Sequence, residues 1–108
     1  RSGARMVSRG DVAWFEPPEL SRRPVLVLTR DAVIPYLSQL VAAPLTRTIR
    51  DIPTEVHLDE ADGVPVECVV SLDNVFSVRP AFLTEHITSL GPARMAEVCA
   101  ALRRAVGC

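Results

Sequence analysis

Residues 24–29 read PVLVLT, and this stretch decides how the rest of the sequence is interpreted. Its four Val and Leu side chains follow one another without a polar residue, so a strand here must be buried on both faces. Pro24 is tolerated only where such a strand begins, because proline cannot donate to a sheet ladder. The stretch therefore predicts an interior strand of a packed sheet.

Further short strands are favoured on both sides of this one. They are predicted at residues 12–15, 39–45, 54–58, 68–72, 75–78 and 86–90. Pro44 is expected to end the second of them, and within 54–58 the alternation places Val56 and Leu58 inward. The connecting segments are predicted as loops over 16–21 and 46–53, an irregular excursion over 31–38, an acidic turn over 59–65 and one helical turn over 80–85.

The C-terminal segment has a helical rather than a strand period. From Pro92 onward, apolar residues recur on one helical face at Met95, Val98, Cys99, Leu102 and Val106. Pro92 suits the first position of a helix and Gly107 suits its end. Many short strands followed by one helix, in a chain of this size, predict a mainly β protein: a small antiparallel barrel or curled sheet.

Length and composition indicate one domain. The chain has 108 residues, of which 48% are hydrophobic and 23% charged, the composition of an ordinary globular protein. No apolar run approaches the ~20 residues of a membrane span, so we expect a soluble, cytoplasmic protein. Residues 1–5 (RSGAR) precede Met6, so we expect them to be a vector-derived remnant and the domain to span residues 6–108.

The three cysteines do not predict a disulfide framework or a zinc site, because their number is odd and no C-x-x-C pair occurs. Cys68 and Cys99 have apolar neighbours and are expected to be small buried hydrophobic residues. No role is assigned to Cys108.

Charge is unevenly distributed along the chain, although the net charge is only −1. Residues 1–50 contain eight arginines and four acidic residues, residues 51–73 contain seven acidic residues and no arginine, and residues 74–108 contain four arginines and two acidic residues. A protein that coats nucleic acid in bulk carries excess positive charge, so that class is excluded. A local arginine-lined groove that holds a short polyanion remains compatible with this distribution.

The familiar motifs of phosphate loops, nucleophile elbows and zinc proteases do not occur. Asp59, Glu60 and Asp62 are interpreted as a solvated turn rather than a cation site. A two-histidine nuclease is disfavoured, because His57 is predicted to face outward and nothing places His86 near it. For the scattered aromatic side chains, core packing is the default expectation; these are Trp14, Phe15, Phe76 and Phe82.

Several blocks, taken in order, resemble the MazF/PemK family of toxin endoribonucleases of toxin–antitoxin systems. The blocks, which lead up to the C-terminal amphipathic helix, are SRGDVAWF (8–15), RRPVLVLTRD (22–31), VAAPLTRT (41–48), IPTEVHL (52–58) and CVVSLDNVFSV (68–78). The resemblance implies a small SH3-like antiparallel barrel that dimerises and binds a cognate antitoxin protein. It also implies cleavage of single-stranded RNA at a short sequence, without metal or cofactor, to 2′,3′-cyclic phosphate and 5′-hydroxyl ends, which inhibits translation and growth.

Site residues are carried over from the same resemblance. Arg23 in the RPVLV motif and Thr46 in the APLT motif are the implied catalytic residues. Asp73 and Asn74 occupy the place of the family's Asp-Gln pair, which lies near the RNA groove. The implied RNA-binding residues are Arg22, Arg47, Thr48, Asp73, Asn74 and Phe76.

The chemistry of these residue types fits such a reaction. RNA cleavage through its own 2′-hydroxyl needs stabilisation of a negatively charged phosphorane, and a guanidinium fork matches two phosphate oxygens. Because a guanidinium does not ordinarily give up its proton, Arg23 is interpreted chiefly as an electrostatic stabiliser, and the general base is left unassigned. The alternatives are an ion pair of Arg23 with Glu19 and a turn in which the Thr46 hydroxyl caps its own backbone. Phe76 is left open between stacking on a base and packing in the core.

The sequence also departs from the family pattern. The loop at 16–22 is short and lacks the Gly-x-Glu element that many relatives carry beside the RNA channel, which leaves the recognised RNA sequence open. One alternative function is a toxin of the same fold that has no nuclease activity and binds a protein target such as DNA gyrase. A second is a degenerate toxin that only engages an antitoxin.

Overall fold

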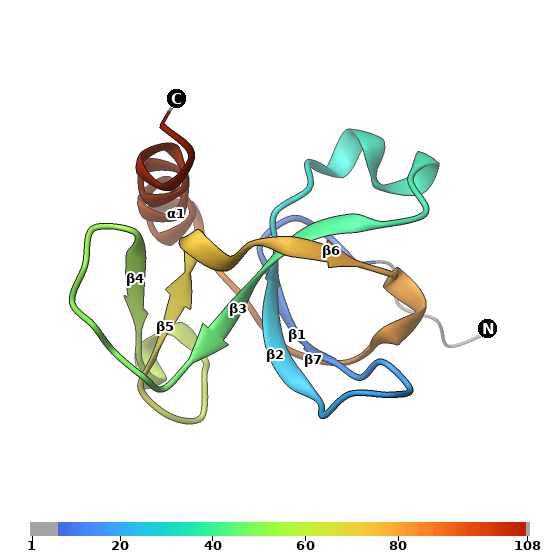
Figure 1. Cartoon of the computed structure of the whole chain (residues 1–108), viewed down its shortest axis with the longest axis horizontal. Coiled ribbons are helices and arrows are strands. Elements are labelled where there is room, and N and C mark those ends of the chain that lie inside the picture. Colours follow the sequence, from blue (N-terminus) through green and yellow to red (C-terminus); the bar gives the residue numbers. More distant parts are fainter. Residues whose placement is uncertain (1–6, 108) are drawn as a thin grey trace.

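The PVLVLT stretch forms β2 (Arg23–Val27) and its continuation, and it divides two apolar cores in the computed structural model of the chain (Figure 1). Val25 and Val27 belong to one core, whereas Leu26 and Leu28 belong to the other. Three of these four side chains are fully buried and Leu28 is 5% exposed. The prediction of a strand buried on both faces is confirmed.

Seven strands and one α-helix make up the described part of the chain, residues 7–107. The expectations for residues 1–5 and for Cys108 lie outside this part. The remaining strands are β1 (Asp11–Phe15), β3 (Leu40–Thr46), β4 (Glu55–Leu58), β5 (Cys68–Ser71), β6 (Phe76–Val78) and β7 (Leu83–Ser89). The short 3₁₀ helices are η1 (Asp31–Tyr36), η2 (Glu60–Asp62), η3 (Leu72–Asn74) and η4 (Pro80–Phe82).

The strands form one antiparallel sheet that is curled but not closed. Their order is β4-β5-β3-β2-β1-β7, with β6 paired to β3, so β4 and β7 end the sheet within residues 7–107. The prediction of a small, mainly antiparallel β fold with one C-terminal helix is confirmed, and of its two forms, a barrel or a curled sheet, the structure has the open curled sheet. The turn after β4 contacts β7, because the Thr88 hydroxyl donates to the Asp62 carbonyl oxygen at 3.0 Å.

This contact requires a glycine at position 63. A Cβ at Gly63 would lie 2.3 Å from the Thr88 hydroxyl oxygen, and Gly63 has φ +93°.

Strand β3 continues through Pro44 to Thr46, so the prediction that Pro44 ends it was wrong. One edge of β3 pairs with β6 through Ala42 and with β5 from Leu45 onward. Pro44 lies between these two ladders, where that edge has no partner, and proline is tolerated at such a position. The continuation carries Thr46 to the end of the sheet.

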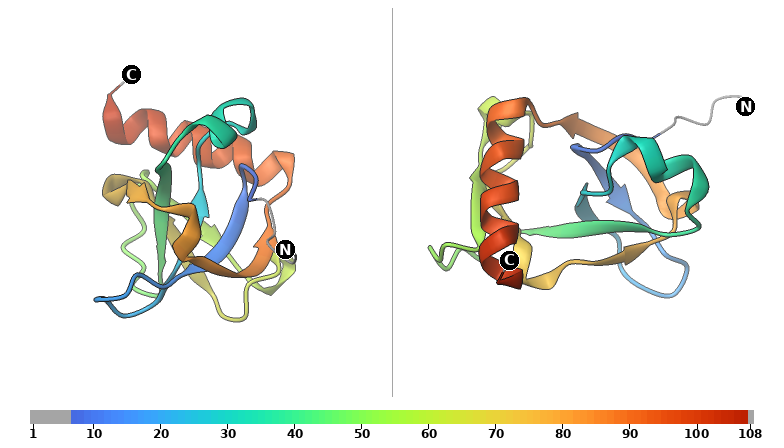
Figure 2. Two further views of the ribbon diagram at one scale, coloured as in Figure 1. Left: turned by 90° about the vertical axis from the view of Figure 1, so that its right-hand side faces the viewer. Right: turned by 90° about the horizontal axis from the view of Figure 1, so that it is seen from above.

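Helix α1 (Pro92–Val106) begins at a proline and ends at Gly107, which has the left-handed φ of 73°. It lies along one side of the molecule, with most of the strands extending away from it (Figure 2). Val98 is fully buried as expected, but the neighbouring Ala101 is also buried and Val106 is 56% exposed. Met95, Leu102 and Ala105 pack against the same core, so the helix contacts it along most of its length and departs from the predicted stripe at Val106.

Three smaller expectations change in the structure. Residues 31–36 form a 3₁₀ helix rather than an irregular loop, and β7 begins at Leu83 rather than at His86. Cys99 is only half-buried, and its sulfur accepts a hydrogen bond from Arg9 Nη2 at 2.9 Å. Among the described residues, no helix is long and apolar enough to cross a membrane.

The acidic turn is tied to the helix rather than simply solvated. Asp59 and Asp62 cap each other's backbone at η2, and Arg94 of α1 donates to Asp62 through Nε at 2.8 Å and through Nη2 at 3.1 Å. The hydrogen bond from Arg94 is the main reason that the pKa of Asp62 lies below its ordinary value of 3.8, and it likewise raises the pKa of Arg94. The Asp62 side chain is 10% exposed, so this pair is shielded from solvent on the carboxylate side.

We expect Arg94→Ala to lower the free energy of unfolding by about 1 kcal/mol at neutral pH. Because the folded-state pKa of Asp62 is depressed, the contribution of the pair is complete above the ordinary value of 3.8 and is lost as the pH falls through the lowered value. Urea unfolding across this pH range measures the difference. Glu97→Gln, which removes only the weaker contact of Arg94, is the control. A difference that stays constant into strong acid would contradict the role of Asp62.

Candidate functional site

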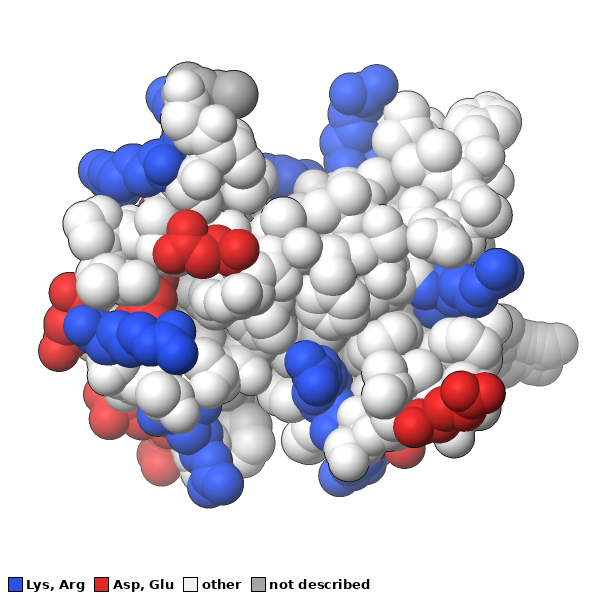
Figure 3. Space-filling view, viewed as in Figure 1, with Lys and Arg blue, Asp and Glu red and all other residues white. Residues whose placement is uncertain are grey.

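An open groove of about 650 Å³ lies where β2 begins and β3 ends. Three of its lining residues are arginines, and none is acidic or a histidine. The lining residues are Ser21, Arg22, Arg23, Pro44, Leu45, Thr46, Thr48, Arg50, Ser71, Asn74 and Phe76. Figure 3 shows arginines at the lower centre of this face of the molecule and several acidic residues toward the side of β4. The groove therefore has the charge that suits a short polyanion.

The two predicted catalytic residues lie just beyond the end of the β2–β3 ladder. The last pair of that ladder is Val25 with Pro44, and Arg23 and Thr46 each lie two residues beyond this pair. Both side chains line the groove. The structure thus brings a guanidinium and a hydroxyl to one cavity.

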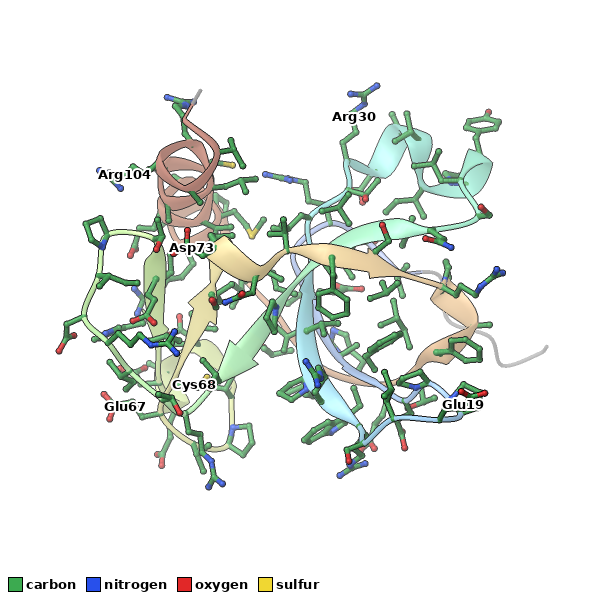
Figure 4. The ribbon with its side chains drawn as sticks, in the orientation of Figure 1. Glu19, Arg30, Glu67, Cys68, Asp73 and Arg104 are labelled. Atoms are coloured by element: carbon green, nitrogen blue, oxygen red, sulfur yellow. The ribbon has the colours of Figure 1, made fainter. Side chains whose placement is uncertain are left out.

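The backbone of Arg23 belongs to β2, whereas its guanidinium group forms no ion pair with the described residues. Arg23 is exposed, and within residues 7–107 it forms no ion pair, so the alternative pair with Glu19 is not made. Glu19 lies on the loop between β1 and β2 (Figure 4). The neighbouring Arg22 stacks its guanidinium on the Trp14 ring, 4.0 Å from the ring centroid. Positive charge in the groove is therefore not cancelled by a bound carboxylate.

The Thr46 hydroxyl takes part in a turn and can still donate to a ligand. Its Oγ1 accepts a hydrogen bond from the backbone N–H of Thr48 at 3.1 Å. The backbone-capping alternative is therefore present in the structure. A hydroxyl that accepts such a bond still has its own hydrogen to give. The turn fixes the oxygen at the groove and leaves its proton for a ligand.

The far wall of the groove comes from the segment after β5. The Asn74 Nδ2 donates to the Oγ of the buried Ser71 at 2.8 Å, which fixes the amide. Phe76 packs edge-on against Phe15 with the ring centroids 5.7 Å apart, and it also lines the groove. Phe76 is thus part of the core and of the groove wall at once.

Two predicted RNA-binding residues do not line this groove. The Asp73 carboxylate accepts a hydrogen bond from the Thr54 hydroxyl, and Asp73 lies near α1 (Figure 4). Arg47 borders a neighbouring hollow of about 450 Å³ whose walls are mostly apolar and include Cys68. Cys68 is buried as expected, and burial raises the pKa of its thiol. The roles of Arg47 and Asp73 stay predictions.

The two histidines have separate partners. His57 Nε2 lies 3.1 Å from Asp51, and His86 Nε2 lies 2.9 Å from the Ser89 hydroxyl. They belong to β4 and β7, the two ends of the sheet, and neither lines the groove. No group of three or more metal-ligating side chains occurs among the described residues.

Sequence reasoning missed three polar residues of the groove, Ser21, Arg50 and Ser71. Arg50 had a usable signal, because it lies in the same polar loop as Thr46 and Thr48. Ser71 had none, since it reads as one more residue of a buried strand.

Comparison with known proteins agrees with this fold. A family model described as "PemK-like, MazF-like toxin of type II toxin-antitoxin system" matches residues 8–106. A probable endoribonuclease MazF5 of Mycobacterium tuberculosis is 45% identical over 102 residues, which cover 94% of each chain. A probable endoribonuclease MazF2 of the same species is 41% identical over 101 residues, covering 93% of this chain and 98% of the relative.

Solved structures give the same result. An endoribonuclease in complex with its cognate antitoxin, from a mycobacterial species, superposes with a TM-score of 0.84 at 27% identity and covers 94% of this chain and 96% of its own. A MazE–MazF structure from Deinococcus radiodurans gives a TM-score of 0.80 at 27% identity, covering 95% and 97%.

The curled sheet with a single C-terminal helix is thus the fold of a class of small toxins. The chain belongs to the PemK-like, MazF-like toxin family of type II toxin–antitoxin systems.

Proposed function

We propose that this toxin is an endoribonuclease that cuts single-stranded RNA without a metal ion, with Arg23 and Thr46 as its catalytic residues. The observation that carries the proposal is that Arg23 and Thr46, from the start of β2 and the end of β3, line one groove. The curated relatives are themselves named endoribonucleases, which supports RNA as the substrate.

In the proposed reaction, the 2′-hydroxyl oxygen of the RNA attacks the adjacent phosphorus. The bond from phosphorus to the 5′-oxygen of the next nucleotide breaks, which leaves a 2′,3′-cyclic phosphate and a 5′-hydroxyl. The Arg23 fork binds two phosphate oxygens, and the Thr46 hydroxyl donates to one of them, so both stabilise the charge of the phosphorane. The proton of the 2′-hydroxyl leaves to solvent and the 5′-oxygen takes one from solvent. No residue is assigned as the base, because no carboxylate or imidazole lines the groove.

The donor set of the groove favours this mode over metal-assisted hydrolysis. Divalent metals that act on phosphates are held by carboxylate oxygens, whereas the groove offers three guanidiniums and neutral polar groups. Guanidiniums bind the phosphate directly. Phe76, Asn74 and Thr48 line the same groove, which supports the proposal that they contact the sugar or base of the same strand.

The proposal includes two partners. A relative is solved with its cognate antitoxin, and we propose that a short antitoxin with an acidic tail occupies this groove in place of RNA. We also propose a homodimer, because exposed apolar side chains remain for a second copy to cover. They include Leu20, Tyr36 and Leu37.

Treating a mixed-sequence RNA with the purified protein in excess EDTA tests the proposed activity. We expect cleavage at full rate, with 5′-hydroxyl ends that polynucleotide kinase labels directly and 3′ ends that resist ligation until the cyclic phosphate is removed. Loss of cleavage in EDTA, restored by Mg²⁺, would contradict the mechanism. A protein that binds DNA gyrase and cuts no RNA under any condition would support the non-nuclease alternative.

A further inference from the structure

The loop between β3 and β4, residues 47–54, brings one more cation into the groove. Arg50 lines the groove together with Arg23 and Thr46. Its side chain is exposed and, within the described part of the chain, makes no ion pair. An unpaired guanidinium on a groove wall is available to a phosphate.

The loop is held in place by a carboxylate of β4. Oε1 of Glu55 accepts hydrogen bonds from the backbone N–H of Arg50 at 2.9 Å and of Asp51 at 3.1 Å. Oε2 of the same side chain is buried and has no hydrogen-bond partner in the described structure. A buried carboxylate oxygen without a hydrogen-bond partner costs free energy. Here the other oxygen of the same side chain fixes the backbone that carries Arg50.

The loop conformation is strained at one residue. Asp51 has φ 55°, and it is the one residue other than glycine with positive φ among residues 7–107. Its carboxylate contacts His57 Nε2 at 3.1 Å, so β4 holds this residue through both its backbone and its side chain. Strained residues persist where surrounding contacts determine them, and they gather at binding sites.

We propose that Arg50 binds a phosphate of the RNA next to the one that is cut, and that Glu55 is the positioning residue that holds Arg50 there. This inference rests on the proposed function. In the proposed reaction Arg23 and Thr46 contact the reacting phosphate, whereas Arg50 lines the groove from the loop between β3 and β4. Arg50 therefore contributes to the binding of the strand, with its effect in KM rather than in kcat.

Binding of a non-cleavable probe tests this inference apart from cleavage. The probe is a short, randomised, fluorescein-labelled RNA with a 2′-O-methyl group on every ribose, and anisotropy is measured in EDTA at several salt concentrations. We expect Arg50→Ala to weaken binding about 3- to 10-fold and to reduce the slope of log K against log salt by about 0.7. Arg30→Ala removes the same charge from the segment before η1, far from the end of β3 (Figure 4), and is expected to leave the slope unchanged.

The Glu55→Ala variant tests the positioning role, because it removes the oxygen that accepts both backbone N–H bonds. We expect it to change the slope in the same direction as Arg50→Ala, and the double variant to bind no more weakly than Arg50→Ala alone, because both changes remove one contact with the RNA. Glu85→Ala, on the exposed part of β7, is the matched control. Glu55→Ala that lowers only the thermal midpoint, with an unchanged slope, would overturn the positioning role.

Two further outcomes separate the inference from the proposed function. If Arg50→Ala binds the probe as Arg30→Ala does, the inference is wrong, whereas cleavage of unmodified RNA in a parallel assay would leave the proposed function standing. If the wild-type protein does not bind the probe, the inference is also wrong. Salt-dependent binding that requires Arg50 supports the inference even when no cleavage is seen.

Discussion

Arg23→Ala is expected to slow the single-turnover cleavage of RNA by at least about a hundredfold, because it removes both guanidinium contacts to the phosphorane. Arg23 lies at the exposed start of β2 and has no ion pair within residues 7–107, so its loss leaves no buried charge unpaired. The fold is therefore expected to remain, with thermal unfolding close to that of the wild type. Arg23→Lys keeps the charge without the planar fork and is expected to recover only a small part of the rate.

Arg30→Ala is the matched control for this variant. It also removes one exposed arginine, but from the segment before η1, and is expected to cut RNA at the wild-type rate. Wild-type cleavage by Arg23→Ala would show that the assigned site is wrong. Equal loss in the Arg23→Ala and Arg30→Ala variants would show that net charge, rather than the groove, decides the rate.

Thr46→Val is expected to lower the same rate by about a hundredfold, as removal of one donor to a developing oxyanion commonly does. Valine keeps the branched shape that suits the end of β3, so the change is confined to the hydroxyl. The variant also loses the oxygen that accepts the Thr48 N–H, which loosens the turn. Thr46→Ser restores both the acceptor and the donor and is expected to recover most of the activity.

Recovery by serine separates chemistry from structure at this position. A Thr46→Val variant that cuts RNA at the wild-type rate would show that the Thr46 hydroxyl takes no part in the reaction. A Thr46→Ser variant as slow as Thr46→Val would show that the methyl group, and hence packing, is what matters there.

Local patterns were sufficient for the elements that carry strong periodicity. The unbroken VLVL run could only be satisfied by burial on both faces, and β2 does divide two cores. Pro92 and Gly107 marked the ends of α1 correctly, because both act through their own backbone geometry. The end of a strand was predicted less well where it depends on the neighbouring strands of the sheet. Pro44 was expected to end β3, yet it lies between the part of β3 that pairs with β6 and the part that pairs with β5. No local pattern in the sequence shows where these two partners meet along the edge of β3.

Some residues of the groove were predicted from the sequence and others were not. Arg23 and Thr46 came from the family resemblance, and the antiparallel pairing of β2 with β3 then explains why the start of one strand and the end of the other line the same groove. Arg50 was missed although it lies in the same polar loop as Thr48. That this loop brings Arg50 to the groove depends on Glu55, which fixes the loop through hydrogen bonds to backbone N–H groups. Such contacts leave no periodic signal in a sequence.

A double-mutant cycle in excess EDTA tests most directly whether these two side chains serve one phosphate. Single-turnover rates are compared for the wild type, Arg23→Ala, Thr46→Val and the double variant on one RNA. If both groups stabilise the same phosphorane, the double variant is slower than Arg23→Ala by far less than the factor that Thr46→Val costs alone. Fully multiplicative losses, or any rate that depends on added Mg²⁺, would contradict this account.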